Sequence, residues 1–134
     1  MKADLRQNHL VLADFEQLED VVAYHQAWYA AYTDSIPSPD SLLRVRVHQV
    51  DTKFRDWFAR HVAATRQLRI HLGEMDGHLY RARAGTRSRI QVTRAWDSDQ
   101  LEFDRLSAHC RKVQDSYLAL ADAYAVFDTL VPGN

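Results

Sequence analysis

The sequence predicts an all-α protein, an antiparallel three-helix bundle with a long central helix. Apolar residues recur every three or four positions in three separate runs, and the first two runs are separated by the proline-containing segment "TDSIPSPD". The 134 residues are 46% hydrophobic and 26% charged, which is typical of one globular domain. We therefore expect residues 1–134 to form a single helical domain.

The first apolar run predicts a helix over about residues 14–34. Its face consists of Phe15, Leu18, Val22, His25, Tyr29 and Tyr32. Asp14 followed by Gln17 has the form of a capping box, which would begin the helix. Two prolines then end it, and Ser38 with Pro39 supplies a cap and a favoured first residue for the next helix.

The second run predicts the central helix, which begins near residue 39. Its seam has a heptad-like spacing over almost four repeats and consists of Leu43, Val47, Val50, Phe54, Trp57, His61, Ala64 and Leu68. We expect Phe54, Trp57, Phe58 and Leu68 to lie in the core or in an oligomer interface.

The third run predicts a helix over about residues 98–130. Asp97 and Gln100 form a second potential capping box, and Trp96 and Leu101 occupy the two positions of a hydrophobic staple. The apolar face continues through Leu106, Cys110, Val113, Tyr117, Leu120, Tyr124 and Phe127.

Residues 71–96 admit two interpretations. In the first, the seam continues to Ala82, Gly85 caps the helix, and the central helix spans 39–84, about 67 Å at 1.5 Å per residue. In the second, the helix ends near residue 72 and the period-two alternation in "YRARA" and "RIQVT" forms a basic β-hairpin or arm. Seam continuity favours the long helix, whereas the matching of helix lengths favours the arm.

The long-helix interpretation leads us to expect a homo-oligomer, a dimer or higher. With the outer helices confined to 14–34 and 98–130, much of the central helix would have one neighbour only. Because burying a single large apolar side chain is worth up to about 3 kcal/mol, a second copy is expected to cover the seam.

Charge is divided unevenly along the chain, although the net charge is only −1. Residues 10–40 contain six acidic residues and no Lys or Arg, and residues 97–134 contain seven acidic residues against three basic ones. Between them, residues 77–96 contain five arginines and no acidic residue: Arg81, Arg83, Arg87, Arg89 and Arg94. Such asymmetry indicates a binding surface and says little about the fold.

The arginine window is our candidate partner-binding site, together with Tyr80. Its charge suits an acidic protein surface, such as residues 10–40 of another copy. The first alternative is a nucleic-acid-binding module, in which the arginines contact phosphates and an aromatic ring stacks on bases. The sequence pI of about 6.6 disfavours that alternative, because nucleic-acid-binding domains are typically basic overall.

Catalytic and cofactor motifs are sparse, so the sequence predicts a protein that acts by binding and is not an enzyme. His71 and Glu74 lie three residues apart, but no second such pair completes a dimetal site, and we expect no metal or cofactor. The chain has four glycines and no phosphate-binding loop. Cys110 lies in the apolar stripe, where a buried structural role is expected.

A ribonuclease is the second alternative. The segments "RDWFARH" (Arg55 to His61) and "RQLRIH" (Arg66 to His71) resemble the Arg–His pair of small all-α HEPN-type ribonucleases, in which about four to six residues separate the Arg from the His. With fourteen Arg and seven His in the chain, about two such matches arise by chance. The spacing therefore adds little to the prediction.

The cellular location follows from what the sequence lacks. It shows no run of about eighteen apolar residues, no signal-peptide apolar region and a single cysteine. We therefore expect a cytoplasmic protein that does not span a membrane.

Overall fold

The computed structural model describes residues 2–35, 41–85 and 88–130, and within these ranges every regular element is a helix. The all-α prediction is confirmed. The elements are α1 (Lys2–Glu16), the 3-10 turn η1 (Gln17–Asp20), α2 (Val21–Ser35), α3 (Ser41–Ala84), α4 (Arg89–Asp115) and α5 (Tyr117–Leu130).

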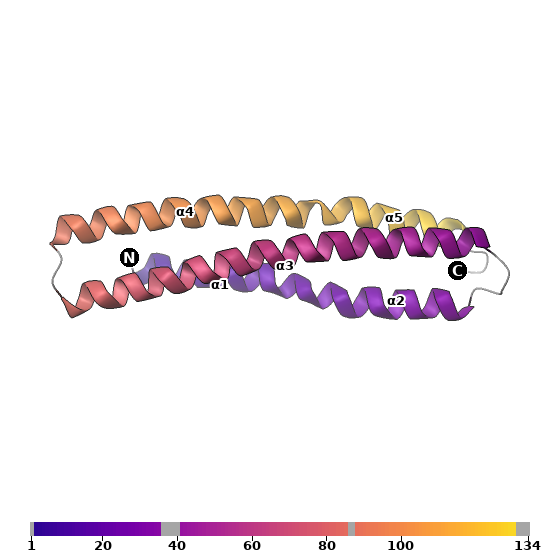
Figure 1. Ribbon diagram of the computed structural model, residues 1–134, viewed down its shortest axis with the longest axis horizontal. Helices are drawn as coiled ribbons and strands as arrows, with labels where there is room; N and C mark the ends of the chain where they lie inside the picture. Colours follow the sequence, from indigo (N-terminus) through magenta and orange to yellow (C-terminus); the bar gives the residue numbers. More distant parts are fainter. Residues whose placement is uncertain (1, 36–40, 86–87, 131–134) are drawn as a thin grey trace.

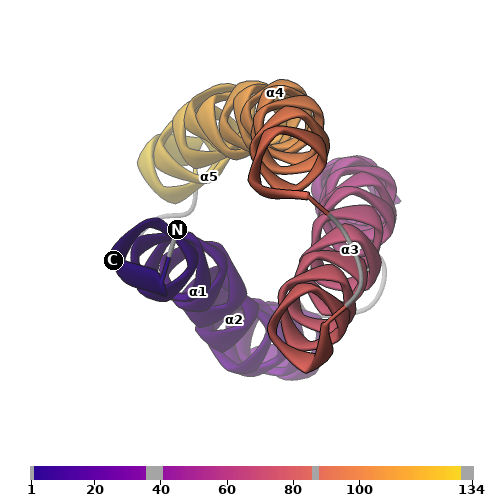
Figure 2. The ribbon, with the colours of Figure 1, turned by 90° about the vertical axis from the view of Figure 1, so that its left-hand side faces the viewer.

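These elements form three rods that run along one long axis (Figure 1). The first rod is α1, η1 and α2, the second is α3 alone, and the third is α4 followed by α5. Figure 2 looks along the axis and shows the three rods surrounding a common interior. Because α3 contacts α1, α2, α4 and α5, it is the element on which both other rods pack.

The core follows the predicted seam of α3. Its most deeply buried side chains include Trp57, Leu68, Leu72, Met75 and Val47. The rod formed by α1 and α2 adds Leu5, Leu12, Phe15 and Trp28, and the rod formed by α4 and α5 adds Trp96, Phe103, Leu106, Cys110, Val113, Leu120 and Tyr124. The three- and four-residue spacing of these positions is the pattern that places side chains on one helical face.

The first rod starts much earlier than predicted, because α1 begins at Lys2 and not near residue 14. Asp14 lies inside α1, so the Asp14–Gln17 capping box is wrong, and the chain instead tightens into η1 at Gln17. Periodicity missed α1 because a polar residue, Asn8, occupies one of its four buried positions. Its side-chain amide pairs with that of Gln100 on α4, with N···O distances of 2.9 and 3.3 Å.

The long-helix interpretation of residues 71–96 is correct, and the β-hairpin is wrong. Helix α3 continues through Gly73 and Gly77 to Ala84, and Gly85 follows with a positive φ of 130°. Glycine tolerates this conformation at a helix end, as the predicted cap requires. In this last turn of α3, Ala82 is partly buried and Arg81 and Arg83 on either side of it are exposed. The alternation of polar and apolar residues that resembled a strand therefore belongs to a helix end with one packed side.

The third rod also starts earlier, at Arg89 and not near residue 98. Ser88 caps α4 through a capping box with Gln91, so the predicted box at Asp97 and Gln100 is wrong. Trp96 is buried inside α4 and Leu101 is 72% exposed, which excludes the predicted staple. The rod is not one helix to residue 130, since α4 ends at Asp115 and α5 begins after Ser116.

Because the outer rods are longer than predicted, the central helix does not need a second copy of the chain to cover its apolar seam. The first rod runs over residues 2–35 and the third over 89–130, so both accompany α3 along nearly its whole length. Phe54, Trp57 and Leu68 are buried within a single chain, and Phe58 packs partly buried against the same core. Self-association therefore requires a different surface from the seam on which we predicted it.

Truncation of the central aromatic residues is expected to destabilise the fold strongly. Trp57 is 2% exposed and its indole Nε1 donates to the Val113 carbonyl oxygen of α4 at 2.8 Å. Trp57→Ala and Phe54→Ala should each lower the free energy of unfolding by about 3–5 kcal/mol, measured by chemical denaturation. Tyr80→Ala at an exposed position is the matched control and should change it by about 0.5 kcal/mol or less. Losses below about 1 kcal/mol at both buried sites would contradict this packing.

Candidate functional site

The predicted partner-binding residues lie at one end of the molecule, where α3 and α4 form a helical hairpin. Arg81 and Arg83 belong to the last turn of α3, and Arg89 and Arg94 to the first turns of α4. All four are exposed, and Arg87 lies outside the described residues. Figure 1 shows this end of the hairpin extending past the start of α1. We call these four arginines, with Tyr80 and Ile90, the basic end.

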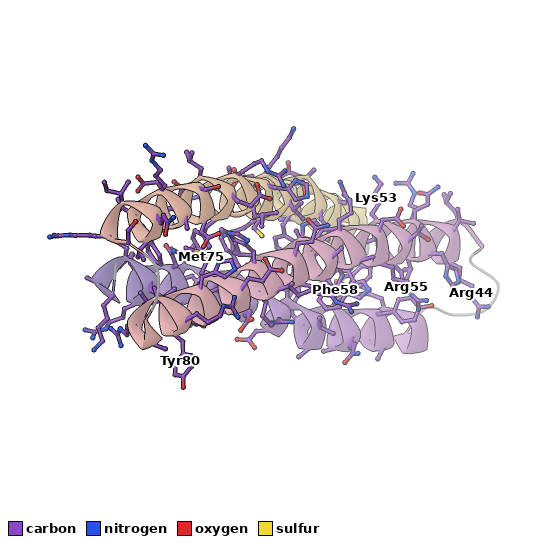
Figure 3. The ribbon with its side chains drawn as sticks, turned by 60° about the vertical axis from the view of Figure 1, so that its left-hand side comes forward. Arg44, Lys53, Arg55, Phe58, Met75 and Tyr80 are labelled. Carbon is purple, nitrogen blue, oxygen red and sulfur yellow. The ribbon has the colours of Figure 1, made fainter. Side chains whose placement is uncertain are left out.

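Large apolar side chains accompany the arginines at the basic end. Tyr80 is 75% exposed and Ile90 is 66% exposed. In Figure 3, Tyr80 points away from the bundle, whereas Met75, slightly earlier in α3, points into it. Among the described residues, none of the four arginines makes an ion pair with a carboxylate. The basic end therefore combines unneutralised charge with exposed apolar surface.

Helix stability explains only half of this charge. Arg81 and Arg83 lie where the α3 macrodipole is negative, so they stabilise the end of that helix. Arg89 lies in the first turn of α4, at the positive end of that helix's dipole, and this turn has no acidic residue to offset it. The charge of Arg89 is therefore unfavourable for the helix.

Polar contacts between α3 and α4 hold the base of the basic end. His78 Nδ1 lies 2.7 Å from Asp99 Oδ2, and His71 Nε2 lies 2.8 Å from the Asp99 carbonyl oxygen. Leu79, Ala82, Val92 and Ala95, all partly buried, border the same junction. The exposed arginines therefore extend from a braced two-helix scaffold.

A buried polar network at the opposite half of the molecule was not predicted from the sequence. His25 of α2, at 4% exposure, has Asp51 of α3 on one side and Tyr124 of α5 on the other. His25 Nε2 lies 2.8 Å from Asp51 Oδ1, and His25 Nδ1 contacts the Tyr124 hydroxyl. Arg55 Nε completes the series at 3.0 Å from Asp51 Oδ2. His25, Asp51 and Tyr124 are distant from one another in sequence, so no local motif marks them.

The chemistry of these groups sets the direction of the hydrogen bonds. The Asp51 carboxylate can only accept, so His25 Nε2 donates to it; in the neutral ring, Nδ1 then accepts from the Tyr124 hydroxyl. Burial raises the pKa of the Tyr124 phenol, which keeps the hydroxyl protonated. The His25 ring also stacks on Phe54, with centroids 3.9 Å apart. The network thus joins all three rods inside the core.

Cys110 is a buried thiol and not an activated nucleophile. It is 1% exposed in the core face of α4, whereas its neighbour His109 is exposed. Burial raises the pKa of Cys110 from 9.0 to about 11. The thiol therefore remains protonated and inaccessible near neutral pH.

The other catalytic candidates are not assembled into an open site. His71 Nδ1 lies 3.6 Å from Glu74 Oε2, but among the described residues no group of three His, Cys, Asp or Glu side chains is placed to hold a metal ion. His61 is fully buried and stacks on Trp57, whereas Arg55 is largely exposed. The His71 ring is held against α4. In the second Arg–His pair, Arg66 is exposed and the His71 side chain is 11% exposed.

Comparisons with known proteins add nothing to the fold class, which is an all-α helical bundle. No protein-family model matches it, and no curated protein or solved structure gives a match. In the described ranges, no helix is both long enough and apolar enough to cross a membrane.

Loss of the Tyr124 hydroxyl should destabilise the fold, because it leaves a buried ring nitrogen of His25 without its partner. Tyr124→Phe is expected to lower the free energy of unfolding by about 1–3 kcal/mol in urea titrations near pH 8. Tyr24→Phe, the same chemical change at an exposed ring on α2, is the control and should have little effect. Equal stability of both variants would show that the Tyr124 hydroxyl contributes nothing to the stability of the fold.

The Cys110 thiol should not react in the folded protein. At pH 8 we expect a thiol-specific disulfide reagent to label it only as fast as the chain unfolds, because the group is both buried and protonated. Denaturant should release full reactivity at once. Rapid labelling of the native chain would contradict the buried position.

Proposed function

We propose that this protein is a non-catalytic helical interaction protein that binds an acidic partner through the basic end. The single observation that carries the proposal is the projecting α3–α4 hairpin, which carries exposed Tyr80 and Ile90 together with exposed arginines that have no carboxylate partner among the described residues. Arg and Tyr are enriched at the energetically important centres of protein interfaces. Arginine also forms bidentate hydrogen bonds with carboxylates, which suits an acidic surface.

The charge distribution supports a protein partner over a nucleic acid. The chain as a whole has a net charge of −1, so a long polyanion would meet repulsion away from the basic end. A compact acidic surface contacts only the basic end and avoids the acidic segments. In this proposal self-association is one use of the same surface, and nucleic-acid binding is the competing outcome of its test.

Removing the charge of the basic end should weaken binding without unfolding the protein. We expect a variant with Arg81→Gln, Arg83→Gln, Arg89→Gln and Arg94→Gln to keep the parental melting temperature within a few degrees, because all four side chains are exposed. Its affinity for a fluorescent poly-glutamate peptide should fall by about tenfold, since each exposed ion pair is worth about 0.2–1 kcal/mol. The difference from the parent should shrink as salt is added.

A matched control replaces four exposed arginines elsewhere: Arg44→Gln, Arg60→Gln, Arg66→Gln and Arg111→Gln. It makes the same change in net charge and should retain most of the peptide affinity. A single-stranded RNA oligonucleotide is titrated in parallel. Equal binding of the peptide by all three proteins would overturn the proposal. Binding of the RNA alone, lost in the first variant with a steep salt dependence, would replace it with the nucleic-acid alternative.

A further inference from the structure

Helix α4 carries a second stripe of residues on the side that faces away from the core. This outer stripe is exposed to solvent, whereas the first stripe is buried in the core. Its positions are separated alternately by four and three residues, and all are exposed: Ile90, Arg94, Asp97, Leu101, Asp104 and Ala108. This spacing places them on one helical face and is the spacing of residues that form a helix–helix seam. The two large apolar side chains of this stripe face solvent in the single chain, Ile90 with 66% and Leu101 with 72% of its surface exposed.

Two surface hollows of opposite charge lie end to end along this stripe. Near the basic end, Arg89, Ile90, Thr93 and Arg94 line a hollow of about 370 Å³. Further along α4, a groove of about 600 Å³ opens between α1 and α4, lined by Asp4, Gln7, Asn8, Trp96, Asp97, Gln100, Leu101 and Asp104. The first is basic and the second acidic, and each has one large apolar side chain of the stripe at its surface.

We infer that a second copy of this chain binds along the outer stripe of α4, with the two α4 helices antiparallel. The inference rests on the proposed function and names its partner. In an antiparallel pair related by a two-fold axis, the sum of two facing residue numbers is constant. A sum of 191 opposes Ile90 to the partner's Leu101 and Arg94 to the partner's Asp97, and the two-fold repeats both contacts. The basic hollow of each copy then faces the acidic groove of the other.

This register satisfies both kinds of exposed group at once. It buries the two large apolar side chains against each other, and it provides a carboxylate partner for Arg94, which has none among the described residues. Shifting the register by one heptad, to a sum of 198, would still oppose Arg94 to Asp104 but would place Leu101 against Asp97. An apolar side chain against a carboxylate is unfavourable, so the first register is preferred.

The structure therefore assigns self-association to the pairing of Arg94 with the Asp97 of a second copy. Both charges lie in the same chain, so the pair can be reversed by substitution. Arg94→Asp brings two carboxylates together on each side of the two-fold axis, and Asp97→Arg brings two guanidinium groups together there. Each single variant should weaken the dimer at least tenfold in sedimentation equilibrium at low salt. A 1:1 mixture of the two variants should associate like the parent, because both facing pairs are restored. The double variant, Arg94→Asp with Asp97→Arg, should also recover as a homodimer.

Two further variants separate the stripe from general charge effects. Arg60→Asp makes the same charge change on exposed α3 and should leave association unchanged. Ile90→Gln should weaken the dimer while leaving the charge unaltered. Circular dichroism and urea melts verify that each variant keeps the parental fold, as expected for exposed positions.

Poly-glutamate binding distinguishes failure of this inference from failure of the proposed function. Arg94→Asp should lower peptide affinity, and Asp97→Arg should not. If Asp97→Arg and Ile90→Gln both associate like the parent, or if the parent remains monomeric up to millimolar concentration, the α4 stripe is not the interface. In either case the proposed function stands as long as the basic end binds the peptide.

Discussion

The long apolar seam of α3 is the constraint on which the remaining structure depends. It carries buried side chains from Val47 to Met75, and a single partner helix would cover only one side of it. Both other rods must therefore be helical over the same length, which is why α1 starts at Lys2 and α4 at Arg89. Burial along this seam also outweighs the helix-breaking tendency of Gly73 and Gly77, each worth about 1 kcal/mol relative to Ala.

The same constraint explains the polar groups found inside the bundle. Rods that must stay in contact over a long distance bring some polar residues to core positions, and each then needs a hydrogen-bond partner from another rod. Asn8 finds one in Gln100, and His25 lies between Asp51 and Tyr124. Because such partners must meet across rods, these contacts favour one register of packing over its neighbours. Their burial, with His25 sealed against Phe54, suits a structural role better than contact with a substrate.

The basic end and the acidic groove both lie where the three-rod arrangement gives way to the α3–α4 hairpin. The basic end lies on the two-helix hairpin beyond the start of α1, and the acidic groove begins where α1 joins α4. These adjacent surfaces of opposite charge on one helix are the feature on which our proposal of a binding role rests.

The sequence by itself determined the fold class, the seam of α3, the helix end at Gly85 and the exposure of Arg81, Arg83, Arg89 and Arg94, because periodicity and charge are local properties of the chain. It did not determine where the outer rods begin. Asn8 occupies a core position and interrupts the apolar pattern, while Asp97 and Gln100 imitate a cap inside a continuous helix. The His25 network and the acidic groove were decided only by tertiary structure, since each joins residues of different rods whose proximity depends on how those rods pack.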